Sequence, residues 1–172
     1  MTTQLANLPQ RRPQGGGYRM YPRLPPRLPR LFPSNPVFFV TLCTYRRRRV
    51  LATIPVNSRF MQFAERAYTK HNIAVGRYVI MPDHIHLFVS GSDDFELGGW
   101  IGTLKQFLTK SVPGKTTSQP FWQRGFFDHV LRSEESYGQK WNYVLDNPVR
   151  AGLVEKAYDW PYAGEIIVID RL

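Results

Sequence analysis

The segment from residue 84 to residue 90 constrains the fold most strongly, because its two faces would differ in chemistry. Side chains alternate between faces along a β-strand. In HIHLFVS one face would be wholly apolar and consist of Ile85, Leu87 and Val89. The other face would carry His84, His86 and Phe88. The pattern predicts a central strand with its apolar side on a core beneath helices and a histidine pair on its other side.

The remaining periodic segments give the order of elements. Runs rich in β-branched and aromatic residues predict strands over 37–45, 73–80, 84–90 and 126–132. Apolar residues at helical spacing predict helices over 57–71, starting near Asn57 or Ser58, over 95–111, and over 133–146, ending before Pro148. This order predicts an α+β fold. We expect a ferredoxin-like antiparallel four-stranded sheet with helices packed on one face, plus a C-terminal helix that carries Tyr143.

Positive charge is concentrated at the start of the chain. The net charge is +10, and residues 1–50 contain ten arginines and no acidic residue, while the remaining basic and acidic residues cancel. Residues 1–35 are basic and rich in proline and glycine, which predicts a flexible arm before one domain over 36–165 and a tail over 166–172. A basic arm favours a polyanionic partner, because neutralising phosphates releases counterions. A solvated arm with no partner is the alternative.

His84 and His86 have the spacing of a metal-binding pair. Two histidines separated by one residue on a strand have Cα atoms about 6.6–7 Å apart. Their imidazoles can then converge on one metal at about 2.0–2.1 Å per bond. Cys43 is the only cysteine, so no cysteine cluster completes a structural zinc site, and an open catalytic site is favoured. Two ordinary histidines on a partly exposed sheet face are the alternative.

The helix over 133–146 places its two tyrosines on different faces. At about 100° per residue, the stripe that should pack against the domain consists of Tyr137, Trp141, Val144 and Leu145. A separate polar face carries, at successive i, i+4 positions, Gln139, Tyr143 and Asn147. The wheel therefore predicts that Tyr137 is a core residue and that Tyr143 is accessible.

Tyr143 is the candidate nucleophile and Asn147 the candidate third metal ligand. A tyrosine hydroxyl is a weak nucleophile by itself, but a divalent metal polarises a bound phosphate and stabilises the leaving oxygen. The amide oxygen of Asn147, together with His84 and His86, gives a mixed nitrogen and oxygen ligand set that suits Mg²⁺ or Mn²⁺. The alternative is an ordinary surface tyrosine and an ordinary residue at a helix end.

Three segments carry a more specific pattern: MPDHIHL at 81–87, FWQRGFFDHV at 121–130 and YVLDNPVRAGLV at 143–154. In this order they resemble the single-tyrosine HUH transposases, in particular the REP-associated tyrosine transposases, over residues 36–160. The resemblance implies metal-dependent cleavage and transfer of single-stranded DNA. His84 and His86 match the family's histidine ligands, Tyr143 matches its nucleophile, and Asn147 falls at its third ligand.

The resemblance also implies a product and a partner. Attack by Tyr143 would leave a 5′-phosphotyrosine and a free 3′-OH, and this linkage keeps the energy needed for rejoining. The branch recognises short palindromic repeats that fold into hairpins, so we expect single-stranded or hairpin DNA as the partner. It implies a monomer, with a dimer that exchanges the tyrosine helix as the alternative. We expect no membrane partner, because the sequence has no membrane-spanning run or secretory signal, and a place in the bacterial cytoplasm with the nucleoid.

Basic and aromatic residues elsewhere give candidate DNA contacts. The candidates for phosphate contacts are Arg46, Arg47, Arg48, Arg49, Lys105, Lys110, Arg124 and Arg132. Trp122 and Phe126 are candidates for stacking on unpaired bases, with core packing as the alternative. We interpret His129 as structural or substrate-adjacent rather than as a ligand.

Two other functions stay open. In a metal phosphodiesterase water would attack, and Tyr143 would be incidental. A non-catalytic DNA-binding relative would bind hairpins without cutting them. The complete set of His84, His86, Tyr143 and Asn147 favours an active enzyme over this second alternative.

Overall fold

The computed structural model describes residues 36–113, 119–131 and 134–169. The arm predicted over residues 1–35, the basic candidate Arg132 and residues 170–172 lie outside these ranges. The division into an arm, a domain and a tail stays a prediction. Across the ranges that are described, no helix has both the length and the apolar composition needed to cross a bilayer.

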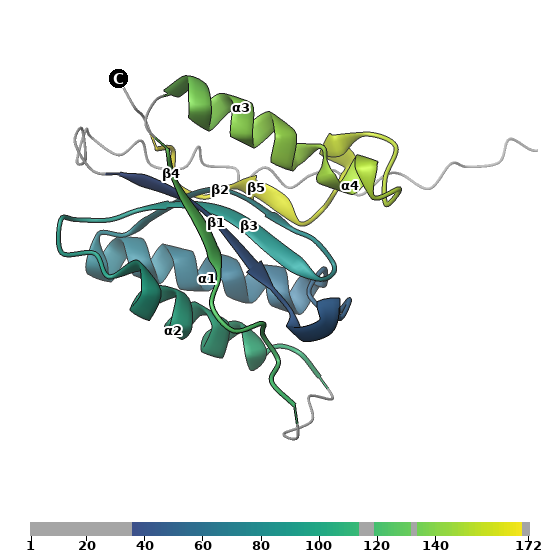
Figure 1. The fold of residues 1–172 in the computed structure, drawn as a ribbon, viewed down its shortest axis with the longest axis horizontal. Coiled ribbons are helices and arrows are strands. Elements are labelled where there is room, and N and C mark those ends of the chain that lie inside the picture. Colours follow the sequence, from purple (N-terminus) through teal and green to yellow (C-terminus); the bar gives the residue numbers. More distant parts are fainter. Residues whose placement is uncertain (1–35, 114–118, 132–133, 170–172) are drawn as a thin grey trace, which may run out of the picture.

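One antiparallel sheet forms the centre of the domain (Figure 1). Its strands are β1 (Val37–Cys43), β2 (Ala74–Ile80), β3 (His84–Ser90), β4 (Phe127–Leu131) and β5 (Ala163–Glu165). They lie in the order β4-β1-β3-β2-β5, so β3 is the central strand. The predicted α+β fold is confirmed, with five strands where the sequence predicted four. β5 has only three residues, too few for an alternating pattern to be recognised.

Helices cover both faces of this sheet. α1 (Ile54–His71) and α2 (Leu97–Thr109) cover one face, and α3 (Glu134–Leu145) covers the other (Figure 1). A short helix α4 (Asn147–Arg150) and two single 3₁₀ turns, η1 (Tyr45–Arg47) and η2 (Ala157–Asp159), complete the described elements. The domain therefore has three layers, with the sheet in the middle.

The face beneath α1 and α2 carries the larger hydrophobic core. Its buried strand residues include Val40, Leu42, Ile85, Leu87 and Val89. They pack in one cluster with buried residues of the two helices, among them Phe60, Ala64, Leu104 and Leu108. The alternation read from residues 85–89 is confirmed, because the apolar positions of β3 point to this core. The histidine pair is consequently turned away from α1 and α2.

The start of α1 differs from the prediction. The sequence placed the first residue near Asn57 or Ser58, whereas the helix begins at Ile54. The side chain of Thr53 caps it by accepting a hydrogen bond from Val56 N at 3.4 Å. Pro55 lies in the first turn, where its missing N–H has no helical partner to lose. The helix therefore starts three to four residues earlier than the apolar periodicity suggested.

α3 packs on the second face of the sheet through the stripe that the helical wheel selected. Tyr137, Val144 and Leu145 are buried, and Trp141 packs against the same cluster. The ring of Phe88 on β3 lies 4.7 Å, centroid to centroid, from the ring of Tyr137. This contact fixes α3 over the histidine side of the central strand. The helix ends at Leu145, and Pro148 lies in the first turn of the separate helix α4.

We expect Phe88→Ala to destabilise the domain strongly, because Phe88 is fully buried between β3 and α3. Removing a buried phenylalanine side chain costs about 3–5 kcal/mol of unfolding free energy. Urea denaturation followed by circular dichroism measures this loss. As a matched control, Val130→Ala on the exposed side of β4 should change the unfolding free energy by about 0.5 kcal/mol or less. Equal effects of the two substitutions would contradict the packing of α3 on the sheet.

Candidate active site

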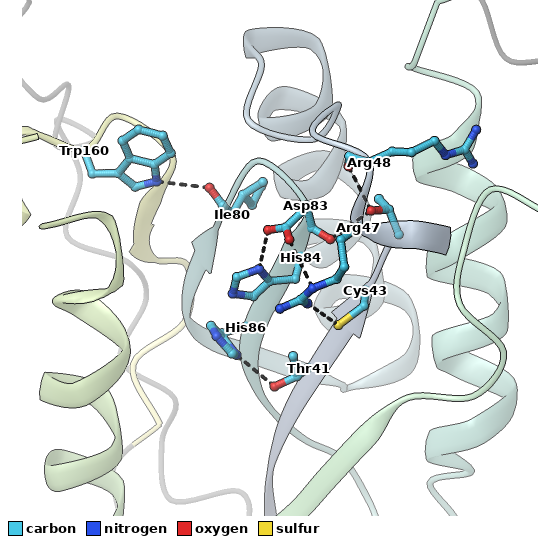
Figure 2. Close-up of polar contacts among 10 residues, drawn as sticks. Thr41, Cys43, Arg47, Arg48, Ile80, Asp83, His84, His86 and Trp160 are labelled. Atoms are coloured by element: carbon cyan, nitrogen blue, oxygen red, sulfur yellow. Dashed lines mark hydrogen bonds and ion pairs between the residues drawn. The ribbon is translucent and has the colours of Figure 1, made fainter. Parts of the chain in front are cut away.

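The two histidines of β3 converge on one side of the sheet (Figure 2). The ring centroids of His84 and His86 are 4.7 Å apart, and the ring planes are inclined by 81°. Both rings are partly buried, and the His84 side chain retains 14% exposure. The ring of Phe39 on β1 stacks on His86 with centroids 5.4 Å apart, which restricts the orientation of that imidazole.

Each imidazole is held through its Nδ1 atom. The Nδ1 atom of His84 lies 2.7 Å from Oδ1 of Asp83, and the Nδ1 atom of His86 lies 2.8 Å from Oγ1 of Thr41 (Figure 2). A carboxylate can only accept here, so the neutral His84 ring donates from Nδ1 and keeps its lone pair on Nε2. His86 has the same arrangement when its Nδ1–H donates to the Thr41 hydroxyl. This is the way in which outer partners orient metal-binding histidines.

Burial favours the neutral form of both rings by lowering their pKa values. It lowers the pKa of His86 to about 3, and the positive charges of Arg47, Lys140 and Arg150 act in the same direction, as does His84. Burial also lowers the pKa of His84, although the hydrogen bond to Asp83 opposes the shift. Metal ligation requires the neutral imidazole, so the surroundings of the pair favour the form that binds a cation.

The turn that precedes β3 is anchored from two sides. Thr44 is fully buried, and both its N atom and its Oγ1 atom donate to the carbonyl oxygen of Asp83 at 3.0 Å. The indole Nε1 of Trp160 donates to the carbonyl oxygen of Ile80 at 3.0 Å (Figure 2). These bonds fix the backbone on both sides of the turn, and they therefore fix the point from which His84 projects.

Arg47 completes a chain of contacts that ends at His84. Its Nε atom lies 3.2 Å from Oδ2 of Asp83, and its guanidinium also lies 2.9 Å from Sγ of Cys43 (Figure 2). Arg46 and Arg47 both adopt a left-handed backbone, with φ of 55° and 54°, which is uncommon for residues other than glycine. This conformation of η1 turns the Arg47 side chain back toward Asp83. The Asp83 carboxylate thus bridges Arg47 and His84.

Replacement of Asp83 should weaken metal binding without unfolding the domain. We expect Asp83→Ala to lower the affinity for Mn²⁺ by about 10–100-fold, because His84 loses the acceptor that orients its ring. Isothermal titration calorimetry measures the affinity, and a thermal melt checks the fold. Asp128→Ala, at an exposed position of β4, serves as the control and should bind Mn²⁺ like the unsubstituted protein. Unchanged affinity in Asp83→Ala would mean that this carboxylate does not support a metal site.

Tyr143 and Asn147 are joined by a shared arginine. Tyr143 is 61% exposed, as the helical wheel predicted. The guanidinium carbon of Arg150 lies 4.0 Å from the centroid of the Tyr143 ring, and an Arg150 N–H donates to the Tyr143 carbonyl at 2.8 Å. The same guanidinium donates to Oδ1 of Asn147. The charge of Arg150 is also among the smaller influences that lower the pKa of His86.

The described residues limit the ways in which a metal can be held. Within residues 36–113, 119–131 and 134–169 there is no group of three or more His, Cys, Asp and Glu side chains that could ligate one ion. A site built on His84 and His86 therefore requires an oxygen of another kind. The sequence predicted the amide oxygen of Asn147 for this role, and that assignment stays a prediction, since the oxygen accepts from Arg150 in the structure.

Several residues predicted to contact DNA make internal contacts. Arg48 donates to the carbonyls of Pro120 and Phe121 at 2.9 and 3.2 Å. The Nζ atom of Lys105 donates to the carbonyl of Gln123 at 3.1 Å, and burial lowers the pKa of this amine. The indole of Trp122 donates to Lys105 O at 3.0 Å and packs against the larger core. These three side chains anchor the segment before β4, a role that the sequence did not suggest for Arg48 and Lys105, whereas core packing was the stated alternative for Trp122.

The other basic candidates lie at the surface. Arg46 is exposed and its guanidinium lies over the ring of Tyr45, 5.4 Å from the centroid. The remaining exposed candidates within the described residues are Arg47, which also pairs with Asp83, and Arg49, Lys110 and Arg124. Their contacts with DNA stay predictions.

Four residues that take part in the site were not selected from the sequence: Thr41, Asp83, Lys140 and Arg150. Asp83 could have been selected, since it directly precedes His84. Thr41 could not, because its bond to His86 depends on the register of β1 against β3, which pairs these two residues across 45 positions of sequence. Lys140 lies 5.2 Å from the Phe39 ring centroid, a contact that depends on how α3 crosses the sheet.

The histidine pair lies on a central strand, and the helix that faces this strand carries an accessible tyrosine. These features define the class of enzyme to which the chain belongs. The chain belongs to the family described as Transposase IS200 like, whose family model matches residues 36–144. It is therefore a transposase, an enzyme of the class that cuts DNA and transfers strands. The span matched includes both histidines and Tyr143, and it ends before Asn147.

Within this family the chain is similar to REP-associated tyrosine transposases. A Haemophilus influenzae protein that carries this name provisionally is 29% identical over 148 residues, which cover 77% of this chain and 81% of the relative. The REP-associated tyrosine transposase of Escherichia coli K12 is 32% identical over 92 residues, or 52% of each chain. A solved structure described as this type of transposase bound to a REP hairpin has a TM-score of 0.63 at 22% identity. That match covers 74% of this chain and 75% of the other, and it supports the fold.

Proposed function

We propose that this transposase cuts and rejoins single-stranded DNA at hairpin sequences through a covalent bond to Tyr143. The observation that carries the proposal is the pair of imidazoles on β3, with ring centroids 4.7 Å apart and each held through Nδ1, which leaves both Nε2 atoms for one cation. The proposed ligands are His84, His86 and Asn147, and the proposed ion is Mg²⁺ or Mn²⁺. When bound, the ion polarises the scissile phosphate and stabilises the leaving oxygen.

The proposed reaction exchanges one phosphodiester for another. The hydroxyl oxygen of Tyr143 attacks the scissile phosphorus and loses its proton. The bond from phosphorus to the 3′ oxygen breaks, and that oxygen takes up a proton to become a 3′-OH. The 5′-phosphotyrosine conserves the phosphodiester bond, so attack by a 3′-OH restores DNA and releases Tyr143 without ATP.

Charges around Tyr143 suit a phosphodiester. The guanidinium of Arg150 lies against the Tyr143 ring, and the charges of Arg150 and Lys140 both reach His86. A phosphate placed between the tyrosine and the histidines would have Arg150 at the Tyr143 ring and Lys140 at the Phe39 ring, which stacks on His86. Positive groups that are already in position stabilise the charge that develops on phosphate in the transition state.

Hairpin DNA is the proposed substrate because relatives carry the REP-associated name and the solved neighbour is described as bound to a REP hairpin. A chromosomal substrate would place the enzyme in the cytoplasm with the nucleoid. A monomer is the proposed state, with a dimer that exchanges the tyrosine helix as the alternative. The ten arginines within residues 1–50 supply further attraction for the DNA backbone.

A covalent-adduct assay tests the proposal. The protein is incubated with end-labelled, single-stranded hairpin DNA and Mn²⁺, and the products are separated on a denaturing gel. We expect a labelled band at the mass of protein plus DNA, together with a shortened strand that ends in a 3′-OH. Chelation of the metal should remove both products.

The alternatives give different gels. A phosphodiesterase that uses water would release cut DNA with no covalent band under any condition. A non-catalytic relative would shift hairpin DNA on a native gel and leave it intact on the denaturing gel. Either result, obtained with protein that melts cooperatively, would refute the proposed strand transfer.

A further inference from the structure

An exposed aromatic side chain lies beside the histidine pair, on the strand at the edge of the sheet. Among the strands that the structure describes, β4 lies at the edge and pairs with β1 alone (Figure 1). Phe127, its first residue, is 62% exposed. In the sheet register Phe127 is the partner of Thr41, and Thr41 is in turn the partner of His86. Phe127, Thr41 and His86 therefore form one row on one face.

The row gives the spacing between the aromatic ring and the proposed centre. Neighbouring strands lie about 4.8 Å apart, so the Cα atoms of Phe127 and His86, two strands apart, are separated by about 10 Å. A stacked nucleic-acid strand rises about 3.4 Å per nucleotide. A base within about three nucleotides of a phosphate bound at the histidines can therefore reach the Phe127 ring.

The neighbouring residue points the other way. Phe126 packs against the larger core with α1 and α2, although the sequence favoured it equally with Trp122 as a stacking residue. Phe127 has the opposite orientation, because alternate residues of a strand project to opposite faces. A single exposed phenylalanine is ordinary on a protein surface. Its place in the row of His86 is what distinguishes Phe127.

The surroundings of Phe127 fit a strand of DNA. His129, two residues further along β4, is exposed and is the register partner of Phe39. The ammonium of Lys140 lies 5.2 Å from the Phe39 ring centroid, on the same side of the sheet. Lys140 and the exposed ring of Phe127 therefore lie on the same face of the sheet. Proteins that bind single-stranded nucleic acids combine such groups, with phosphates on the cation and bases on the ring.

We propose that Phe127 stacks on an unpaired DNA base next to the scissile phosphate and so helps to select the cleavage position. The inference rests on the proposed function, because it takes the histidine pair as the place of the phosphate. The ring would bind any base face, so its contribution is positional rather than a reading of base identity.

A cycle of protein and DNA changes tests this inference. Binding is measured by fluorescence anisotropy in a Tyr143→Phe background, so that cleavage does not disturb the equilibrium. The probes are one hairpin oligonucleotide and a series in which single bases around the cleavage position are replaced by abasic sites. We expect Phe127→Ala to weaken binding of the intact oligonucleotide by about 5-fold to 150-fold, the range for loss of one stacked base.

The abasic series gives the decisive comparison. At one position within about three nucleotides of the cut, loss of the base should weaken DNA binding by the protein that retains Phe127. This loss of affinity should equal the loss that Phe127→Ala causes with the intact oligonucleotide. The same abasic site should cause no further decrease in the DNA affinity of Phe127→Ala. Phe127→Trp should keep the response, and Phe127→Leu, which stays apolar but has no ring, should lose it. Val130→Ala, on the opposite face of β4, should behave like the parent at every position.

Two results would overturn the inference: binding unchanged in Phe127→Ala, or equal losses from every abasic site with and without the ring. Because Phe127 is exposed, melting temperatures should stay close to that of the parent, and Phe127→Leu provides a second variant. The proposed strand transfer is tested independently of the stacking, because its test is the covalent band formed by the wild-type protein. If the effects of Phe127→Ala and of the abasic site are coupled but wild type forms no covalent band, Tyr143 is not the nucleophile. The stacking role of Phe127 would still stand.

Discussion

Tyr143→Phe should abolish the covalent protein–DNA band, with a loss of at least about 10³-fold in adduct formation, because removal of a nucleophile leaves no oxygen to form the bond. DNA binding should persist, because the ring and its contact with Arg150 remain. The measurement is the denaturing gel with labelled hairpin DNA and Mn²⁺. Tyr158→Phe is the matched control, since Tyr158 is also an exposed tyrosine, at 75%, and it should form the adduct at the normal rate.

The variant separates the candidate chemistries. If Tyr143→Phe gives the same covalent band as the unsubstituted protein, another residue is the nucleophile. If it gives the same amount of cut DNA and neither protein forms a band, water is the nucleophile and the enzyme is a phosphodiesterase. Loss of the band together with a cooperative melt at the normal temperature would support Tyr143.

His86→Ala should lose the stimulation of cleavage by Mn²⁺. Metal stabilisation of a phosphoryl transition state contributes several kcal/mol, so we expect a loss of about 10²–10³-fold in rate. Mn²⁺ affinity, measured by calorimetry in the absence of DNA, should fall in parallel. His71→Ala is the control, because His71 is an exposed histidine at the end of α1, across the sheet from the pair.

His86 is partly buried and its Nδ1 atom is bonded to Thr41, so its replacement also affects packing. A thermal melt and hairpin binding without metal therefore accompany the rate. Full metal stimulation in a folded His86→Ala protein would exclude the histidine pair as the metal site. A folded protein that binds hairpin DNA but neither binds Mn²⁺ nor cuts would support it.

The features that sequence could predict are those that depend on local periodicity. The two faces of β3 and the two faces of α3 were read correctly, because burial of Leu87 or Val144 follows from spacing along one element. The start of α1 was wrong by three to four residues, since capping by Thr53 outweighed the apolar pattern. β5 was missed because three residues carry no period.

The contacts that sequence could not predict are those made between elements. Arg47, Lys105 and Trp122 were all selected for charge or aromatic character, which describes a side chain but not its partner. Their bonds to Asp83, to carbonyls before β4 and to α2 depend on the register and on turn geometry. The exposure of Phe127 rather than Phe126 is of the same kind, since a shift of one residue exchanges the faces of a strand.

One guanidinium, that of Arg150, contacts both the candidate nucleophile Tyr143 and the third candidate ligand Asn147. The shared contact affects when these two groups become available to the substrate. The group contacts the Tyr143 ring and carbonyl and the Asn147 side-chain oxygen together. A phosphate bound at this position would compete for the same guanidinium donors, because a charged acceptor forms the stronger hydrogen bond. Under the proposed function, arrival of the substrate would then release Tyr143 and Asn147 together, whereas without DNA both residues stay in contact with Arg150.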